Sequence, residues 1–236
     1  MDTTILHVQN KIAEYTSEVL HSNLPGFTPV DSDVRSSVRS LPTVAPLSVA
    51  APGDAQFVLV DAAGRRTFSR DGGFVLEAGV LKASDGRRVQ GFVGGSAAPT
   101  SLELDAHDQA LGRVRALHIE SDGALCYTRS VIDPQSQQRR QERVCVGVLA
   151  LARFPVGTQL IPSPSGDRAP LGIEPHLGRA GDGNFALLQP GRRDAGQVDM
   201  HRAVDRLHDL YAQLEAMTAA TQAKMGLEKS TLDLVK

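Results

Sequence analysis

The chain has 236 residues, of which 41% are hydrophobic and 22% are charged, and its formal net charge at pH 7 is −2. This length allows one large domain or two smaller ones, and the near-neutral charge argues against a nucleic-acid-binding protein, which normally carries a basic surface. No apolar run approaches the roughly 18 residues that cross a bilayer. The first residues have neither the basic nor the apolar segment of a secretory signal, so we expect no cleavable signal peptide.

A helix is predicted at the N-terminus, over residues 1–24. Its apolar residues alternate at spacings of three and four with polar residues between them, which is typical of one narrow stripe on a helix. These residues are Ile5, Val8, Ile12, Tyr15 and Val19. A short helix with one narrow stripe needs a partner to be stable. The Pro25-Gly26 pair ends the helix before Phe27, so residues 1–27 form the first part of a predicted helical assembly domain.

The next segment, residues 28–54, is predicted to be an extended connector. It contains four of the 13 prolines and shows no sustained hydrophobic period.

Residues 55–190 are predicted to form a β-rich body. Asp-Gly pairs, which favour tight hairpin turns, occur at 71–72, 85–86, 122–123 and 182–183. The predicted strands are residues 56–61, 66–70, 73–77, 80–83, 87–93, 100–104, 111–119, 123–132 and 142–153. Short strands separated by turns every 8–12 residues or so, with no βαβ alternation, indicate an antiparallel β-sandwich or open barrel.

Two cysteines lie in neighbouring predicted strands, 123–132 and 142–152. If Pro134–Gln137 is the hairpin loop, opposed residue numbers sum to 271, so Cys126 faces Cys145. Opposed residues at a non-hydrogen-bonded pair are close enough for a disulfide. A register slip of one residue would separate them, so two reduced, half-buried thiols are the alternative. Two cysteines alone cannot form a zinc site.

A second, longer helix is predicted over residues 197–236, with Asp199 as its N-cap. The a/d positions are Val204, Leu207, Tyr211, Leu214, Thr218, Thr221, Met225, Glu228, Leu232 and Val235. Leu210 and Met217 widen this stripe, which indicates more than one neighbouring helix. We define the predicted assembly seam as Ile5, Val8, Ile12, Tyr15, Val19, Val204, Leu207, Tyr211, Leu214 and Met225. The two stripes are complementary, so we expect the terminal helices to pair.

No catalytic, cofactor or metal site is predicted. The chain lacks a P-loop, a Gly-x-Ser-x-Gly elbow, a His-Glu-x-x-His motif and a dinucleotide-binding glycine motif. His201 and His208 are seven residues apart, which suits solvated positions better than metal binding. Residues 105–108 (Asp-Ala-His-Asp) are interpreted as a turn rather than an acid/base cluster. The basic run 139–143 is interpreted as a solvated hairpin tip. An enzyme using residues 105–108 and His118 is a weaker alternative.

Apolar stripes at both ends of a chain without an active site indicate assembly. Helices that the β body cannot cover must be buried against copies or relatives of the chain, which produces rings or helical filaments. The alternative is a β-sandwich protein-binding module that dimerises through its terminal helices.

Three segments then suggest a family. They are Asn23-Leu24-Pro25-Gly26-Phe27; Thr67-Phe68-Ser69-Arg70-Asp71-Gly72-Gly73-Phe74-Val75-Leu76 with the hairpin 79–91; and Val148-Leu149-Ala150-Leu151-Ala152-Arg153-Phe154. In this order of helix, connector, β body and long helix, the chain resembles the bacterial flagellar basal-body rod and hook family, the axial proteins. The residues that carry the family motifs are Pro25, Gly26, Phe27, Arg70, Asp71, Gly72, Phe74, Asp85 and Gly86.

The resemblance implies a non-enzymatic structural subunit of the basal-body rod. Such a subunit would be exported to the periplasmic rod through the flagellar type III apparatus without a cleavable signal. It would stack helically on copies of itself and on other axial proteins, with the terminal helices lining the inner tube and the β domain outside. No cofactor, nucleic acid, membrane insertion or small-molecule substrate is implied. Length and the single β domain are most similar to the proximal- and distal-rod proteins, and both terminal helices diverge from the family pattern.

Overall fold

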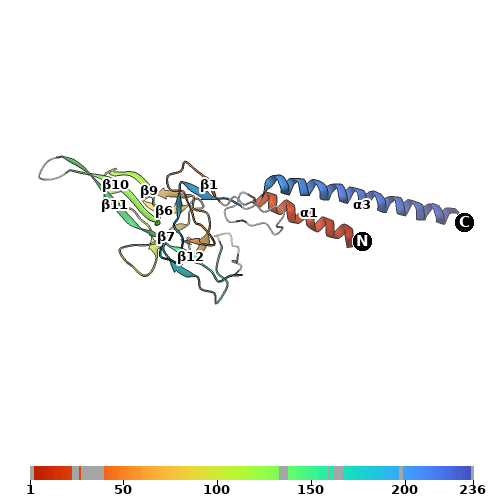
Figure 1. Cartoon of the computed structure of the whole chain (residues 1–236), viewed down its shortest axis with the longest axis horizontal. Coiled ribbons are helices and arrows are strands. Elements are labelled where there is room, and N and C mark those ends of the chain that lie inside the picture. Colours follow the sequence, from red (N-terminus) through yellow and green to blue (C-terminus); the bar gives the residue numbers. More distant parts are fainter. Residues whose placement is uncertain are drawn as a thin grey trace. The chain divides into compact units, whose positions relative to one another are not determined.

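The computed structural model describes residues 3–22, 27, 40–132, 138–158, 160–161, 167–196 and 199–234, with side chains as far as Leu227. The chain divides into two compact units. We call residues 1–39 with 196–236 the helical unit, and residues 40–195 the β unit. The described chain is mainly β, with antiparallel sheets and a helix near each end (Figure 1).

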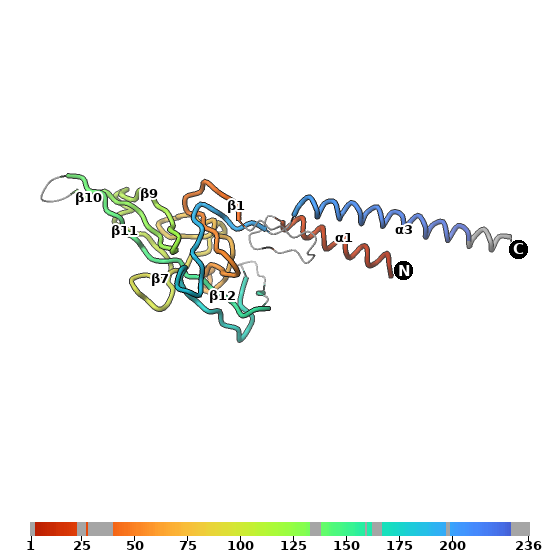
Figure 2. The backbone as a smooth tube through the Cα atoms, in the orientation of Figure 1, coloured from red at the N-terminus to blue at the C-terminus, as the bar shows by residue number. Residues whose placement is uncertain are grey.

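The helical unit contains α1 (Thr3–His21) and α3 (Met200–Leu234). The two helices lie side by side and run antiparallel, and α3 continues beyond the N-terminal end of α1 (Figure 2). At about 1.5 Å per residue, α1 is roughly 28 Å long and α3 roughly 52 Å. The predicted N-cap of α3 is confirmed, because Asp199 Oδ1 accepts a hydrogen bond from the backbone N–H of Arg202 at 3.3 Å.

The β unit contains fifteen strands among its described residues, and every pairing between them is antiparallel. The strands are β1 (Ser40–Pro42), β2 (Val49–Ala50), β3 (Gln56–Val60), β4 (Arg66–Ser69), β5 (Phe74–Glu77), β6 (Val80–Ala83), β7 (Arg88–Phe92), β8 (Thr100–Ser101), β9 (Val114–Ile119), β10 (Ala124–Ile132), β11 (Arg139–Leu149), β12 (Leu151–Arg153), β13 (His176–Gly178), β14 (Gln189–Pro190) and β15 (Arg192–Asp194). A short helix, α2 (Ala106–Ala110), precedes β9.

One large sheet carries most of these strands, in the order β13-β12-β3-β7-β11-β10-β9. Strand β4 adds to β3, and β6 and β8 add to β7, while β5 pairs with β6. Two small two-stranded sheets, β1 with β15 and β2 with β14, join segments from opposite ends of the unit. Most buried apolar side chains of the large sheet gather in a main core, which includes Phe57, Leu81, Leu125, Tyr127 and Leu149. A second, smaller cluster contains Val58, Phe68, Phe92, Ala150 and Ala152.

The predicted register of the β10–β11 hairpin is confirmed over most of its length. Cys126 pairs with Cys145 and Ile132 pairs with Arg139, and both pairs of numbers sum to 271. A bulge between Leu125 and Cys126 then shifts the register towards the base of the hairpin. The predicted loop Pro134–Gln137 lies outside the described residues.

The structure differs from the predicted connector in its second half. Residues 40–54 belong to the β unit, where β1 pairs with β15 and β2 pairs with β14. Leu47 and Val49 are buried in the main core. These strands are two or three residues long, too short to show a hydrophobic period, and their partners lie far along the chain.

Two of the four Asp-Gly pairs do not form the hairpin turns that the sequence suggested. Residues 85–86 and 122–123 do join paired strands, and Gly86 and Gly123 have φ values of +86° and +84°. The pair 71–72 instead joins β4 to β5, which do not pair with each other. Asp182-Gly183 lies in a loop after β13, where Asp182 Oδ1 accepts the backbone N–H groups of the two residues after Gly183.

Candidate functional site

The α1 half of the assembly seam lies at the contact with α3. Val8 and Tyr15 are buried, and Ile5, Ile12 and Val19 are half-buried. Leu6 and Leu20 lie outside the seam and are exposed. In the helical unit, Tyr15 forms an apolar cluster with Val19, Phe27, Ala203, Leu207 and Leu210. The α1 stripe therefore packs within the chain itself.

The seam residues of α3 and their neighbours on the helix divide into two lines. The residues that are buried or half-buried follow spacings of four and three along the helix: Ala203, Leu207, Leu210, Leu214, Met217 and Thr221. Ala203 is fully buried, and sequence reasoning missed it because a single alanine gives little hydrophobic signal. Its small side chain allows the two helix backbones to approach closely.

The remaining seam residues of α3, together with the a/d residue Thr218, form a second, exposed line. We call Val204, Tyr211, Thr218 and Met225 the exposed α3 line. They are spaced seven residues apart, and their apolar members are 37% (Val204), 50% (Tyr211) and 56% (Met225) exposed. A strict seven-residue repeat drifts only about 20° per repeat on a straight helix, so these side chains lie along one side of α3. The line is a continuous, partly apolar strip that α1 does not cover.

In the β unit, the motif residue Arg70 holds the last strand in place. Its Nε and Nη2 donate hydrogen bonds to the carboxylate of Asp194 at 2.9 and 3.3 Å. The Arg70 side chain is 13% exposed and that of Asp194 only 2%. The guanidinium also donates to backbone carbonyls in the turn before β3, those of Ala51, Gly53 and Ala55.

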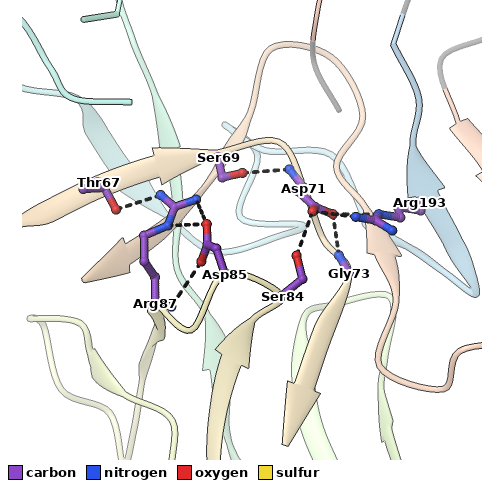
Figure 3. Close-up of polar contacts among 8 residues, drawn as sticks. All are labelled: Thr67, Ser69, Asp71, Gly73, Ser84, Asp85, Arg87 and Arg193. Carbon is purple, nitrogen blue, oxygen red and sulfur yellow. Dashed lines mark hydrogen bonds and ion pairs between the residues drawn. The ribbon is translucent and has the colours of Figure 1, made fainter. Parts of the chain in front are cut away.

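The neighbouring motif residue Asp71 binds the same strand (Figure 3). Its two carboxylate oxygens accept from Nε and Nη2 of Arg193 at 2.8 and 2.7 Å. This bidentate contact raises the pKa of Arg193. Asp71 Oδ1 also accepts the backbone N–H of Gly73, and Ser69 Oγ accepts that of Asp71. Arg70 and Asp71 both hold β15, and β15 pairs with β1, the first strand of the β unit. The two residues therefore fix the place where the chain enters and leaves this unit.

The second part of the motif, Asp85-Gly86, closes the β6–β7 turn. Asp85 Oδ1 accepts the backbone N–H of Arg87 at 3.1 Å, and its Oδ2 accepts Nε of the same residue at 2.8 Å. Although burial opposes it, the bonding from Arg87 lowers the pKa of Asp85. Arg87 Nη1 also donates to Thr67 Oγ1, which ties the turn to β4 (Figure 3).

The remaining motif residues pack in apolar surroundings. Phe74 is buried with its ring edge-on to Phe57, at 5.1 Å between centroids. Gly72 lies where no side chain fits, because a Cβ there would be 1.8 Å from the carbonyl oxygen of Val49. In the helical unit, Phe27 packs against the Tyr15 cluster. Pro25 and Gly26 lie outside the described residues.

Residues 105–108 form part of a helix rather than a plain turn. Asp105 is the N-cap of α2, and its side chain accepts the backbone N–H groups of residues 107 and 108. Asp108 is buried and accepts hydrogen bonds from Tyr127 Oη at 2.7 Å and from Arg129 Nη1 at 3.1 Å. His118 instead contacts the carbonyl of Ala116. Among the described residues, no hydrogen bond joins His118 to either aspartate, so the structure does not assemble them as an acid/base site.

The Tyr127–Asp108 contact makes stability depend on pH. Burial, and then the bond to Asp108, raise the pKa of Tyr127 to about 12. The pKa of Tyr127 in the folded protein thus exceeds its ordinary value of about 10. The stability that the protonated hydroxyl contributes is therefore complete below pH 10 and is lost between pH 10 and 12. At pH 11 this effect makes the equilibrium constant for folding about tenfold smaller than it is well below pH 10. The bond from Tyr127 also lowers the pKa of Asp108. The ionised aspartate therefore stabilises the fold at pH values above its ordinary pKa, and this stabilisation is lost as the pH falls through the lowered pKa.

We therefore expect Tyr127→Phe to be less stable than wild type at pH 8, with the difference narrowing at pH 11. Urea unfolding at both pH values measures this difference. Tyr211→Phe, at an exposed position, is the control and is expected to keep the wild-type pH profile. An equal difference at pH 8 and pH 11 would contradict the role of the Tyr127 hydroxyl.

The structure joins Cys126 and Cys145 in a disulfide between β10 and β11. The arginines of the predicted basic run, 139–143, are exposed along β11. His201 and His208 are exposed on α3, and no group of three metal-binding side chains occurs among the described residues. Within those same residues, no helix is both long and apolar enough to span a membrane.

Comparison with known proteins adds no relative. No protein-family model matches the chain, and none of the curated proteins is significantly similar to it in sequence.

Proposed function

We propose that this chain is a structural subunit of the bacterial flagellar basal-body rod. In this role it polymerises helically, on copies of itself and on other axial proteins, through its terminal helices. The proposal rests on the motif resemblance, and the observation that carries the assembly step is the exposed α3 line. That line leaves apolar side chains at a seven-residue spacing uncovered by α1, which suits a coiled-coil-like contact with another helix.

The same proposal covers the rest of the molecule. The β unit would be an outer domain folded as an antiparallel sandwich or open barrel, which is supported by its antiparallel pairing and by a main core to which many strands contribute. Its polar motif residues bind one another and the backbone, which suits a structural rather than an enzymatic role. We propose protein partners only, without cofactor, nucleic acid or small-molecule substrate, and export to the periplasmic rod through the type III apparatus.

The assembly step is tested by Tyr211→Glu. Burying a charge without a partner costs about 3–5 kcal/mol, so we expect association at least about a hundredfold weaker. The matched control is Gln213→Glu, which adds the same charge at another exposed position of the same helix. Leu207→Glu is less suitable, because Leu207 packs in the Tyr15 cluster and its loss would disturb the α1–α3 pair.

The measurement is sedimentation velocity with electron microscopy over a concentration series. Wild type and Gln213→Glu are expected to form open-ended helical assemblies, and Tyr211→Glu is expected to remain small with normal β-sheet circular dichroism. A closed wild-type dimer of fixed mass would instead favour a binding module that dimerises through its helices. Recovery of the tagged chain in isolated hook–basal bodies tests the location.

A further inference from the structure

We propose that the Cys126–Cys145 disulfide exchanges with external thiols, and that the incoming thiolate attacks one of its two sulfurs in preference to the other. An external thiolate attacks the sulfur of Cys145, and Cys126 leaves as a thiolate beside Arg143. The reacting partner is a small thiol or a dithiol oxidoreductase of the compartment where the protein resides. The proposal does not depend on the rod function.

The two sulfurs of the disulfide differ in access. The two cysteines are directly opposed in the β10–β11 ladder, yet their surroundings differ. Cys126 is fully buried, whereas Cys145 is exposed. Thiol–disulfide exchange requires the incoming thiolate to reach one particular sulfur. Access therefore selects Cys145 as the sulfur that is attacked.

The sulfur of Cys126 has a cation beside it that favours its departure as a thiolate. Arg143 Nη2 lies 3.7 Å from Cys126 Sγ, and it also donates to Glu120 Oε2 at 2.6 Å. The carboxylate of Glu120 thus holds the guanidinium in place. A neighbouring cation lowers the pKa of a thiol, and a thiol of lower pKa leaves faster. Arg143 is therefore a positioning and stabilising residue for the departing sulfur of Cys126.

Reduction by a dithiol takes two displacement steps. The thiolate R–S⁻ forms a bond to Sγ of Cys145, the Cys126–Cys145 bond breaks, and its electron pair stays on Sγ of Cys126. The second thiolate of a dithiol then attacks its own sulfur in the mixed disulfide and releases Cys145 as a thiolate. Two electrons pass from the dithiol, which becomes a disulfide, to the protein. Oxidation of the protein is the reverse sequence.

Exchange would act on the outer part of the hairpin. Within the described strands, β9 pairs with β10 no further than Arg129 opposite Val114. Beyond that point, residues 130–132 are paired only with β11. The disulfide lies three residues before that point, within the part of the hairpin that β9 also pairs, and reduction would loosen the β10–β11 pair from there outward.

The direction is tested on the oxidised, full-length protein with glutathione as the probe. After brief reaction and acid quench, N-ethylmaleimide labels the free thiols and peptide mass spectrometry locates both groups. We expect glutathione on Cys145 and N-ethylmaleimide on Cys126, with at least about tenfold preference. Equal distribution, glutathione on Cys126, or a folded protein whose disulfide resists both glutathione and dithiothreitol would overturn the proposal.

The leaving-group role is tested by Arg143→Gln. We expect reduction by glutathione to slow about threefold or more, while Arg140→Gln, which removes the same charge from an exposed position of β11, leaves the rate unchanged. Thermal unfolding of the oxidised variants checks that both fold. Equal rates for the two variants would remove Arg143 from the mechanism, and the labelling experiment tests the direction without any variant.

Discussion

Replacing Gly72 by alanine is expected to destabilise the β unit by about 2–3 kcal/mol, within the range for overpacked sites. A Cβ at this position would be 1.8 Å from the carbonyl oxygen of Val49 and 2.9 Å from Cε2 of Phe57. The backbone cannot simply move away, because the N–H of Val49 donates to the carbonyl of Gly72 at 3.0 Å. Urea unfolding measures the loss.

The contrasting variant is Gly226→Ala, the same chemical change in α3. A Cβ there meets nothing within 4 Å, and alanine is favoured over glycine inside a helix by about 1 kcal/mol. We therefore expect a small gain in the stability of the helical unit. A Gly72→Ala protein within about 0.5 kcal/mol of wild type, the usual range of neutral surface changes, would contradict the close approach of β2.

Replacing Arg70 by alanine is expected to cost about 3–5 kcal/mol, the usual effect of removing one partner from a buried ion pair. The carboxylate of Asp194, whose side chain is 2% exposed, would remain buried without its guanidinium. The backbone carbonyls that Arg70 holds would lose their donor as well. Arg66→Ala is the control, because Arg66 is exposed on β4, the strand that Arg70 directly follows.

A double variant separates the charge from the loss of packing. In Arg70→Ala/Asp194→Asn the buried carboxylate is neutral, so the pair of changes is expected to cost less than Arg70→Ala alone. Urea unfolding of the four proteins in this cycle gives the coupling between the two residues. If the double variant loses as much unfolding free energy as the two single variants together, the two residues are not coupled and the ion pair contributes nothing.

The sequence predicted the central strands well because their signals are local. Strands β3 to β7 lie between turn residues that fix their ends, and the turn at Asp85-Gly86 needs only its own aspartate and glycine. Asp71-Gly72 has the same sequence, but it needs glycine for a different reason, because Val49 of β2 approaches the backbone there. No local rule separates these two cases.

The helix stripe shows a similar limit. Leu207 and Leu214 lie between the Ala203 side and the Tyr211 side of α3, so the spacing alone cannot decide which of these two sides α1 covers. That choice is made by Tyr15, nearly two hundred residues earlier in the chain, whose ring packs against Ala203. The short strands β1 and β15 were missed for the same reason, because each exists only through its distant partner.

The pairing of β1 with β15 has a consequence for the chain as a whole. Ser40 is the first residue of the β unit and pairs with Asp194, one residue before the end of the unit, so the two ends of the unit are about 5 Å apart, the spacing of neighbouring strands. A module whose ends meet in this way can be exchanged for another of different size or deleted in favour of a short turn, with the two attachment points left unchanged. The size and sequence of the β unit can thus vary without a change in the helices that flank it.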